Sequence, residues 1–278
     1  MGMMAAGHEP VGWCEIDKFA RKSYKEVYNT DGEWTARDVR KVKPEELPEA
    51  DCYTAGFPCQ SFSIAGKRGG FEDTKGTLFF EILRLAKERK PKSLLLENVK
   101  GLLSHDKGAT FGTILKSLAE LGYDAEWQVL NSKDFGVPQN RERVFIIGHL
   151  RGASRPKVFP IRRETERIKK DENFLLIHNV YGGFNEEEVR KFDKYCPTIR
   201  TPKGGGHLPE VISLKEKLRR KLTPKECWRL QGFSDWAFEK AQKVNSDTQL
   251  YKQAGNSVTT TVVYEIAKRL KGANNDKA

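Results

Sequence analysis

The sequence predicts an α/β protein in which a mostly parallel sheet is followed by a second, smaller and irregular domain. From Glu9 to Gly148, short β-rich runs alternate with segments of helical periodicity, which is the pattern of βαβ units. Beyond Gly148 the composition and the periodicity of the sequence change. Residues 151–173 are rich in charged side chains and lack periodicity, and residues 196–209 are rich in Gly, Pro and Thr. We therefore expect one domain over residues 1–150, a second over 151–246, and a C-terminal segment, 247–278, whose helix returns to the first domain.

Hydrophobic periodicity places the elements of the first domain. Strands are predicted at residues 11–15, 51–55, 93–97 and 143–148, where β-branched, aromatic and other apolar residues cluster. Helical faces recur between them, at Leu78, Phe79, Ile82, Leu83 and Ala86, and at Phe111, Ile114, Leu115, Leu118 and Leu121. Thr223-Pro224 is a helix-start signal, and Val258, Val262, Val263, Ile266 and Leu270 share one face of a final helix.

Composition narrows the class of function. The 278 residues include 49 Lys and Arg against 38 Asp and Glu, and the resulting net charge of +11 favours a polyanionic partner, although a basic surface without a specific partner explains it equally well. No apolar run approaches the ~20 residues of a membrane-spanning helix, so we expect a cytoplasmic protein without membrane contact. The five cysteines form no C-x-x-C pair, which indicates neither a disulfide framework nor a metal site.

Cys59 is the first candidate for chemistry. The segment Gly56-Phe-Pro-Cys-Gln-Ser-Phe-Ser63 follows a predicted strand directly, so the thiol belongs at the edge of the sheet where ligands bind in open α/β folds. A lone cysteine is more often a small buried hydrophobe. Here Pro58 stiffens the backbone before the thiol and polar residues follow it, which favours a partly exposed nucleophile.

Two further polar motifs adjoin predicted strands. Leu94-Leu95-Leu96 runs into Glu97, and a carboxyl at the end of an apolar strand tends to have a raised pKa, which suits it to hold or share a proton near neutrality. Arg141 and Arg143 alternate in Gln-Asn-Arg-Glu-Arg, so they share one face of an extended segment and suit recognition of phosphate, carboxylate or a base carbonyl. Taken singly, either motif is more often solvated surface.

Together these motifs resemble the cytosine-5 DNA methyltransferase family, in its bacterial or phage restriction-modification type. Its Pro-Cys-Gln, Glu-Asn-Val and Gln-x-Arg-x-Arg motifs occur in order at Pro58, Glu97 and Gln139. The segments 222–233 and 253–258 are similar to its last two motifs. The resemblance covers roughly residues 7–150 and 222–271, and it implies a Rossmann-like sheet of the S-adenosylmethionine-dependent methyltransferases with a small, irregular target-recognition domain.

The resemblance implies a covalent reaction. The thiolate of Cys59 would add to carbon 6 of a flipped cytosine, so that carbon 5 can attack the methyl group of S-adenosylmethionine. Glu97 would contact the ring nitrogen and amino edge of the base, and Arg143 its carbonyl. Arg141 would contact the thiol or a nearby phosphate. Cofactor-binding residues carried over by motif are Glu15, Asp38, Gly56, Pro58, Leu78, Asn256 and Ser257.

DNA contacts are expected from two regions. The glycine-rich basic loop after the thiol, with Gln60, Ser63, Lys67 and Arg68, is expected to close over double-stranded DNA. In the second domain, Arg163 and Lys170 would neutralise phosphates, while Arg200 and Lys203 belong to a segment suited to reading bases. We expect a monomer, and the family type suggests a cognate restriction endonuclease as a partner.

The chain departs from the family pattern at its start. Family members open with a strand and a Phe-x-Gly-x-Gly-Gly loop that cradles the cofactor, whereas Met1-Gly-Met-Met-Ala-Ala-Gly7 looks like the end of the helix that follows this loop. The strand would lie in the sheet between the strand that ends at Glu15 and the strand that leads to Cys59. We expect a truncated gene or a misplaced start codon. The alternatives are an inactive, truncated DNA-binding remnant and an RNA cytosine-5 methyltransferase.

Overall fold

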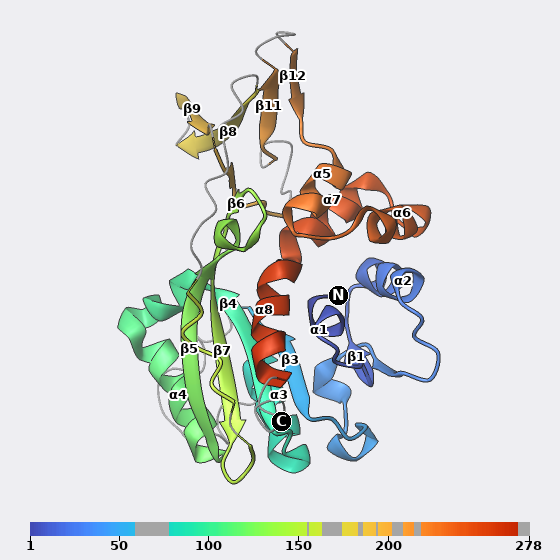
Figure 1. Ribbon diagram of the computed structural model, residues 1–278, viewed down its shortest axis with the longest axis vertical. Helices are drawn as coiled ribbons and strands as arrows, with labels where there is room; N and C mark the ends of the chain where they lie inside the picture. The colour runs from blue at the N-terminus through green and yellow to red at the C-terminus, as the bar shows by residue number, and fades with distance from the viewer. Residues whose placement is uncertain are drawn as a thin grey trace, which may run out of the picture.

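The computed structural model describes residues 1–58, 78–154, 156–162, 174–182, 186–192, 194–201, 208–213 and 218–271. Two sheet-containing parts lie one above the other in Figure 1, with helices α5, α6 and α7 between their levels. The helices are α1 (Gly2–Ala5), α2 (Lys18–Val27), α3 (Leu78–Arg89), α4 (Ala109–Glu120), α5 (Pro224–Leu230), α6 (Asp235–Val244), α7 (Asp247–Asn256) and α8 (Thr260–Lys271).

The main sheet has the strand order β3-β4-β7-β5, from β3 (Cys52–Gly56), β4 (Ser93–Val99), β7 (Glu142–Leu150) and β5 (Tyr123–Asn131). Strands β3 and β4 are parallel, whereas β7 is antiparallel to both β4 and β5. The α/β class is confirmed, but this sheet is mixed where the sequence predicted a mostly parallel one. The connection from β5 to β7 is too short for a helical crossover, so those two strands pair antiparallel.

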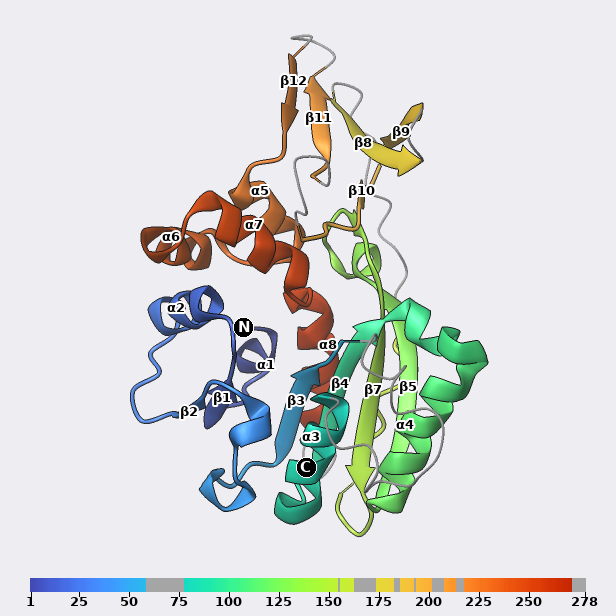
Figure 2. The same ribbon diagram turned by 180° about the vertical axis from the view of Figure 1, so that it is seen from behind.

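Helices cover both faces of this sheet. Leu94 and Leu96 of β4 pack with Leu83 of α3 and Ile114 of α4 in one apolar cluster. Leu95, which lies between them on the strand, packs on the other face in a cluster that includes Val262 and Ile266 of α8. This alternation is what a strand buried on both sides requires. Figure 1 shows α8 crossing one face, and Figure 2 shows the face that carries α3 and α4.

A short pair of strands stands apart from the main sheet. Strands β1 (Gly12–Cys14) and β2 (Trp34–Ala36) are parallel and form a sheet of their own. Among the described residues β1 pairs with β2 alone and β3 pairs with β4 alone, so both β1 and β3 keep one free backbone edge. The separation of the β1–β2 pair from β3 is visible in both ribbon views.

The upper part holds a second sheet, wholly antiparallel, in the order β12-β11-β8-β9. Its strands are β8 (Phe174–Gly182), β9 (Glu186–Phe192), β11 (Glu210–Ser213) and β12 (Leu218–Lys221). Below it, β10 (Cys196–Pro197) pairs with β6 (Gln139–Asn140), which ties this part to the connection between β5 and β7. Thr223 and Glu226 form a capping box at the start of α5, where the sequence predicted a helix start.

The described residues contain no candidate for a membrane-spanning helix or for a metal-binding cluster. Within the described ranges, no helix has the length and apolar character needed to cross a membrane. The same residues contain no cluster of three or more His, Cys, Asp or Glu side chains placed to hold a metal ion.

Candidate active site

The candidate site begins where β3 and β4 end together. Gly56 pairs in register with Glu97, so the chain leaves β3 beside the Glu97 side chain. A Cβ atom at Gly56 would lie 3.4 Å from Oε2 of Glu97, which places the carboxyl directly against the exit of β3. Cys59 follows three residues later and lies outside the described residues.

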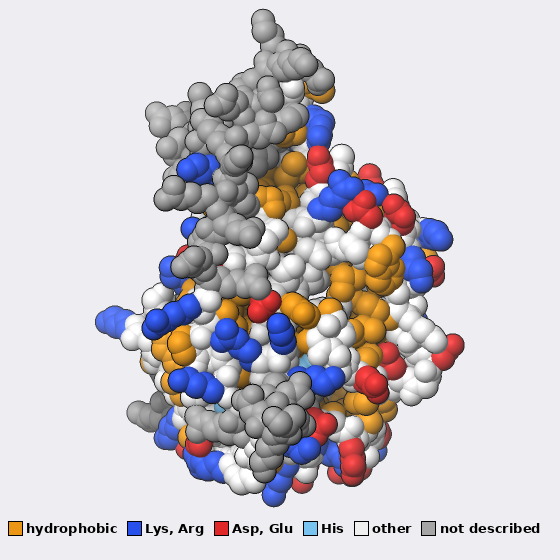
Figure 3. All heavy atoms as spheres, in the orientation of Figure 1, with side chains coloured by type: hydrophobic (Ala, Val, Ile, Leu, Met, Phe, Trp, Pro, Cys, Tyr) orange, Lys and Arg blue, Asp and Glu red, His pale blue; other side chains and the backbone are white. Residues whose placement is uncertain are grey.

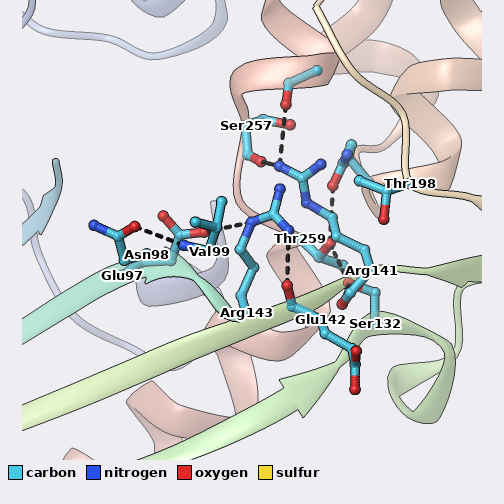
Figure 4. A network of polar contacts seen from close by, with 12 residues as sticks. Glu97, Asn98, Val99, Ser132, Arg141, Glu142, Arg143, Thr198, Ser257 and Thr259 are labelled. Atoms are coloured by element: carbon cyan, nitrogen blue, oxygen red, sulfur yellow. Dashed lines mark hydrogen bonds and ion pairs between the residues drawn. The ribbon is translucent and has the colours of Figure 1, made fainter. Parts of the chain in front are cut away.

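Glu97 forms an ion pair with Arg143 from the neighbouring antiparallel strand. Nε of Arg143 lies 3.1 Å from Oε1 of Glu97, and the two side chains are only 15% and 17% exposed, respectively. Figure 4 shows the two side chains pointing toward one another from β7 and β4. Burial raises the pKa of Glu97 above that of an ordinary carboxyl, although the charges of Arg143 and Arg141 oppose the shift. The site therefore holds a carboxyl whose protonated form is favoured by desolvation.

Asn98 is a residue that the sequence reasoning did not single out. Its buried side chain donates from Nδ2 to the carbonyl of Phe57 at 2.7 Å, and its Oδ1 accepts from the backbone N–H of Val99 at 2.8 Å. Phe57 is itself buried in the main apolar cluster, where its ring lies 5.1 Å from that of Phe79. Asn98 thus fixes the backbone between Gly56 and the thiol segment. Asn98 could have been identified from the sequence by its middle position in the Glu-Asn-Val motif.

Arg141 contacts backbone carbonyls within the described residues. Its guanidinium is buried and donates to the carbonyls of Ile199 (3.0 Å), Gly255 (3.1 Å) and Ser257 (2.8 Å). Burial, and secondarily the charge of Arg143, lower the pKa of Arg141 to about 9, so it stays a cation at neutral pH. Among the described residues it joins three chain segments. The expected contact with the thiol or a phosphate stays a prediction, because Cys59 lies outside the described residues.

A cavity of about 390 Å³ lies between α1, α2 and the α7–α8 junction. It brings together three of the expected cofactor residues, namely Glu15, Asn256 and Ser257. Its apolar wall comes from Tyr24, Tyr28, Trp228, Phe233, Val258 and Val263. Figure 3 shows hydrophobic side chains gathered on this face between the levels of α6 and α2.

Polar contacts fix the two sides of this cavity. The Glu15 carboxylate accepts from the backbone N–H of Asp17 at 2.8 Å, and Asp17 caps α2 while pairing with Lys252 of α7. Ser23 donates to Oε1 of Gln253 at 2.7 Å. The Nε2 atom of Gln253 is buried and has no hydrogen-bond partner among the described residues. It is a donor that a bound ligand would satisfy.

The remaining expected cofactor residues do not line this cavity. Asp38 follows β2, and β2 pairs with β1, the strand that leads to Glu15, with Ala36 in register with Cys14. Asp38 is engaged by Arg40 through hydrogen bonds of 2.8 and 2.7 Å, and this contact lowers its pKa to about 2. Gly56 and Pro58 lie at the exit of β3, and Leu78 opens α3 against the main apolar cluster.

Most of the expected DNA contacts lie outside the described residues. Of that set, only Arg200 is described, as an exposed residue on the segment that follows β10. The charge of Arg200 acts on Arg143 and contributes to the lowered pKa of Arg143, whose first cause is burial. The residues that the structure does not describe are Gln60, Ser63, Lys67, Arg68, Arg163, Lys170 and Lys203.

Comparison with known proteins finds methyltransferases similar to this chain. The chain is 39% identical over 282 residues to the Type II methyltransferase M1.ScrFI of Lactococcus lactis subsp. cremoris, covering 92% of this chain and 70% of that protein. It is 37% identical over 302 residues to the Type II methyltransferase M.Bsp6I of Bacillus sp. (strain RFL6), covering 97% of this chain and 94% of that protein.

Solved structures share the fold at lower sequence identity. The S. pombe Dnmt2 methyltransferase matches with a TM-score of 0.66 and 18% identity, over 98% of this chain and 96% of that chain. The Entamoeba histolytica methyltransferase EhMeth matches with a TM-score of 0.64 and 19% identity, over 97% and 94%. The family described as C-5 cytosine-specific DNA methylase matches over residues 1–194 and 162–272. With nearly the whole chain matched, the protein belongs to the C-5 cytosine-specific DNA methylase family.

Proposed function

We propose that this protein is a DNA (cytosine-5)-methyltransferase that acts on a flipped cytosine through a covalent adduct with Cys59. The observation that carries the proposal is the half-buried Glu97–Arg143 pair beside Gly56, at the edge of the sheet from which the Cys59 segment leaves. A proton donor and a guanidinium side by side match the two polar edges of a cytosine ring. Family membership supports the same reaction.

The reaction needs a nucleophile because carbon 5 of cytosine is itself unreactive. The Cys59 thiolate forms a bond to carbon 6, and the electron pair of the 5,6 double bond moves toward carbon 5. Glu97, protonated, donates to the ring nitrogen, and Arg143 donates to the base carbonyl, so both stabilise the charge that enters the ring. Carbon 5 then takes the methyl group from bound S-adenosylmethionine, and S-adenosylhomocysteine leaves. A base then removes the proton from carbon 5, the 5,6 double bond forms again, and the bond between carbon 6 and the Cys59 sulfur breaks to return the thiolate. The proton on the ring nitrogen returns to Glu97.

The cavity beside Glu15 fits the expected methyl donor. Its volume of about 390 Å³ lies in the range of small-molecule sites, and it combines apolar walls with a few polar groups. Glu15 would bind ribose hydroxyls, Asn256 and Ser257 the amino acid end, and the unpartnered Nε2 of Gln253 an acceptor of the ligand. S-adenosylmethionine, when bound, supplies an electrophilic methyl group. We include Asp38, Gly56, Pro58 and Leu78 in the proposed site as the family motifs assign them.

Duplex DNA is the proposed substrate. The net charge of +11 suits a polyanion, and Arg200 places a guanidinium on the exposed segment next to Arg143. The names of the relatives as Type II methyltransferases support a cognate restriction endonuclease as a partner. The separation of β1 from β3 favours one alternative, a DNA-binding protein without transfer activity.

Covalent capture tests the proposal. The chain is incubated with S-adenosylmethionine and a random-sequence duplex pool in which 5-azacytosine replaces some cytosines, and adducts are resolved under denaturing conditions. We expect a covalent protein–DNA band for the wild type and none for Cys59→Ala, which should still bind DNA. A parallel reaction uses transfer RNA transcripts that contain the same analogue.

Each outcome separates the candidates. Capture of DNA that requires Cys59 supports the proposed reaction. Capture of RNA alone favours an RNA methyltransferase. A folded wild type that binds DNA without forming any adduct contradicts the proposal and favours a binding role.

A further inference from the structure

The segment 199–201 joins the upper part of the molecule to the cavity. It follows β10, which pairs with β6, and it ends at Thr201, directly before the glycine-rich run that the sequence predicts to contact DNA. Three independent contacts hold this segment against the end of α7. They involve Gly255, Arg141 and Asn256.

Gly255 makes the closest of these contacts. A Cβ atom at this position would lie 2.5 Å from the backbone nitrogen of Thr201 and 2.6 Å from the carbonyl carbon of Arg200. Both neighbours are backbone atoms, so a side chain at residue 255 would displace the segment itself. The absence of a side chain at Gly255 is what permits this approach.

Arg141 joins the segment 199–201 to the end of α7 from inside the molecule. One guanidinium nitrogen donates to the carbonyl of Ile199, and another donates to the carbonyls of Gly255 and Ser257. Because Arg141 is only 3% exposed, moving either segment would leave a buried charge without its acceptors. The two segments therefore move together or not at all.

Thr201 completes the link to the proposed cofactor site. Its hydroxyl donates to Oδ1 of Asn256 at 2.6 Å, and Asn256 and Ser257 line the cavity. This bond fixes the Oδ1 end of the Asn256 amide. The position of the segment 199–201 thus bears on the orientation of a side chain that lines the cavity.

We propose that Thr201 is a positioning residue that couples the binding of duplex DNA at the segment 199–201 to the affinity of the cavity for the cofactor. The inference rests on the proposed function and adds the specific route by which the two ligands communicate. DNA that contacts Arg200 and Thr201 holds Thr201 against Asn256, and a bound cofactor in turn holds Asn256 against Thr201. By linkage, each ligand then strengthens the binding of the other by the same factor.

The test measures this factor in the whole chain. Calorimetry gives the Kd of S-adenosylhomocysteine, alone and with excess sheared, unmethylated genomic DNA, which presents every short target site. For the wild type we expect DNA to tighten binding by roughly 5-fold or more. Thr201→Val, which keeps the shape and removes the hydroxyl, should bring this ratio to within about 2-fold of unity, and Thr201→Ser should restore it.

Thr198→Val is the matched control. Thr198 lies directly before the segment 199–201, and its hydroxyl donates to the carbonyl of Asn140 at 2.7 Å and not to Asn256. We expect this variant to keep the wild-type ratio. Gly255→Ala provides a second, steric test, and it should abolish the ratio while the chain still unfolds cooperatively.

The outcomes distinguish this inference from the proposed function. A wild-type ratio of one, or an unchanged ratio in Thr201→Val, overturns the coupling even if covalent capture of DNA succeeds. A wild type that neither binds S-adenosylhomocysteine nor captures DNA overturns both. Loss of the ratio in Thr201→Val, with retention in Thr198→Val, supports the positioning role.

Discussion

Glu97 and Arg143 reach toward each other from adjacent antiparallel strands, with Nε and Oε1 3.1 Å apart. The pair is displaced along the strands, since Glu97 is in register with Phe145 and Arg143 is in register with Val99. Both side chains therefore lean over the end of the sheet, next to the exit of β3. This contact between Glu97 and Arg143 is shielded from water and holds its geometry before any base arrives, which is the condition for stabilising charge as it develops.

The first prediction concerns Glu97→Gln. Because the proposed role requires a proton on the carboxyl, the neutral amide cannot replace it, and we expect the rate of covalent capture to fall about 10²-fold or more. Burial raises the pKa of Glu97, so in the wild type the protonated form is lost as pH rises through that value, and capture should decline there. The pH profile of the capture rate measures this directly.

Glu142→Gln is the control for that experiment. Glu142 directly precedes Arg143 on β7, and its exposed carboxylate pairs with Lys100 at 3.0 Å. We expect an unchanged capture rate and an unchanged profile for this variant. If Glu97→Gln retained wild-type capture across the pH range, Glu97 would not be the proton donor.

The second prediction concerns Asn98→Ala. Loss of the 2.7 Å hydrogen bond leaves the Phe57 carbonyl without its donor in a buried site, which costs roughly 1–3 kcal/mol in the free energy of unfolding. The exit of β3 also loosens, so capture by Cys59 should slow by more than the stability loss alone explains. Chemical denaturation and single-turnover capture check the two effects separately.

Ser104→Ala provides the comparison for Asn98. The Ser104 hydroxyl donates an exposed hydrogen bond of 3.3 Å to the carbonyl of Gly101. Because water can replace this donor, its loss should cost little free energy of unfolding. We expect both the unfolding free energy and the capture rate to stay close to wild type. A destabilised Asn98→Ala that captured DNA at the wild-type rate would limit Asn98 to a structural role.

Sequence patterns predicted the apolar strand before Glu97 and the helices on either side of it, because burial on both faces leaves a periodicity that can be read locally. They missed β5, whose Tyr-Asp-Ala-Glu-Trp run mixes polar and apolar residues on a half-buried strand. They also gave no indication that Arg141 donates to the carbonyls of Ile199, Gly255 and Ser257. Contacts between residues 58 to 116 positions apart depend on tertiary packing, and no local pattern encodes them.

The third prediction follows from the free edges of β1 and β3. Among the described residues each pairs on one side only, and Val11 and Ile16, which flank β1, are 43% and 68% exposed. A strand followed by a Phe-x-Gly-x-Gly-Gly loop, fused ahead of Met1, should pair with these edges and cover that apolar surface. We expect a higher melting temperature and tighter binding of S-adenosylhomocysteine.

A fusion of the same length with prolines at alternate strand positions is the control, since proline cannot donate to a ladder. It should leave both quantities unchanged. Equal effects from the two fusions would show that strand pairing is not the cause. No effect from either would mean that the two edges do not accept a strand.

The last prediction concerns Glu226 and the pH dependence of stability. Its carboxylate accepts from Arg220 at 2.8 Å and from the backbone N–H of Thr223 at 2.7 Å, and these contacts lower its pKa to about 2. A carboxyl whose folded pKa is depressed stabilises the fold above its unfolded pKa, and this contribution is lost as pH falls toward the folded value. Glu226→Gln should therefore be destabilised at pH 7, and its deficit relative to wild type should shrink as pH falls from about 4.5 toward 2. Denaturation across this window checks the sign, and a deficit independent of pH would mean that the ionised carboxylate is not what stabilises the start of α5.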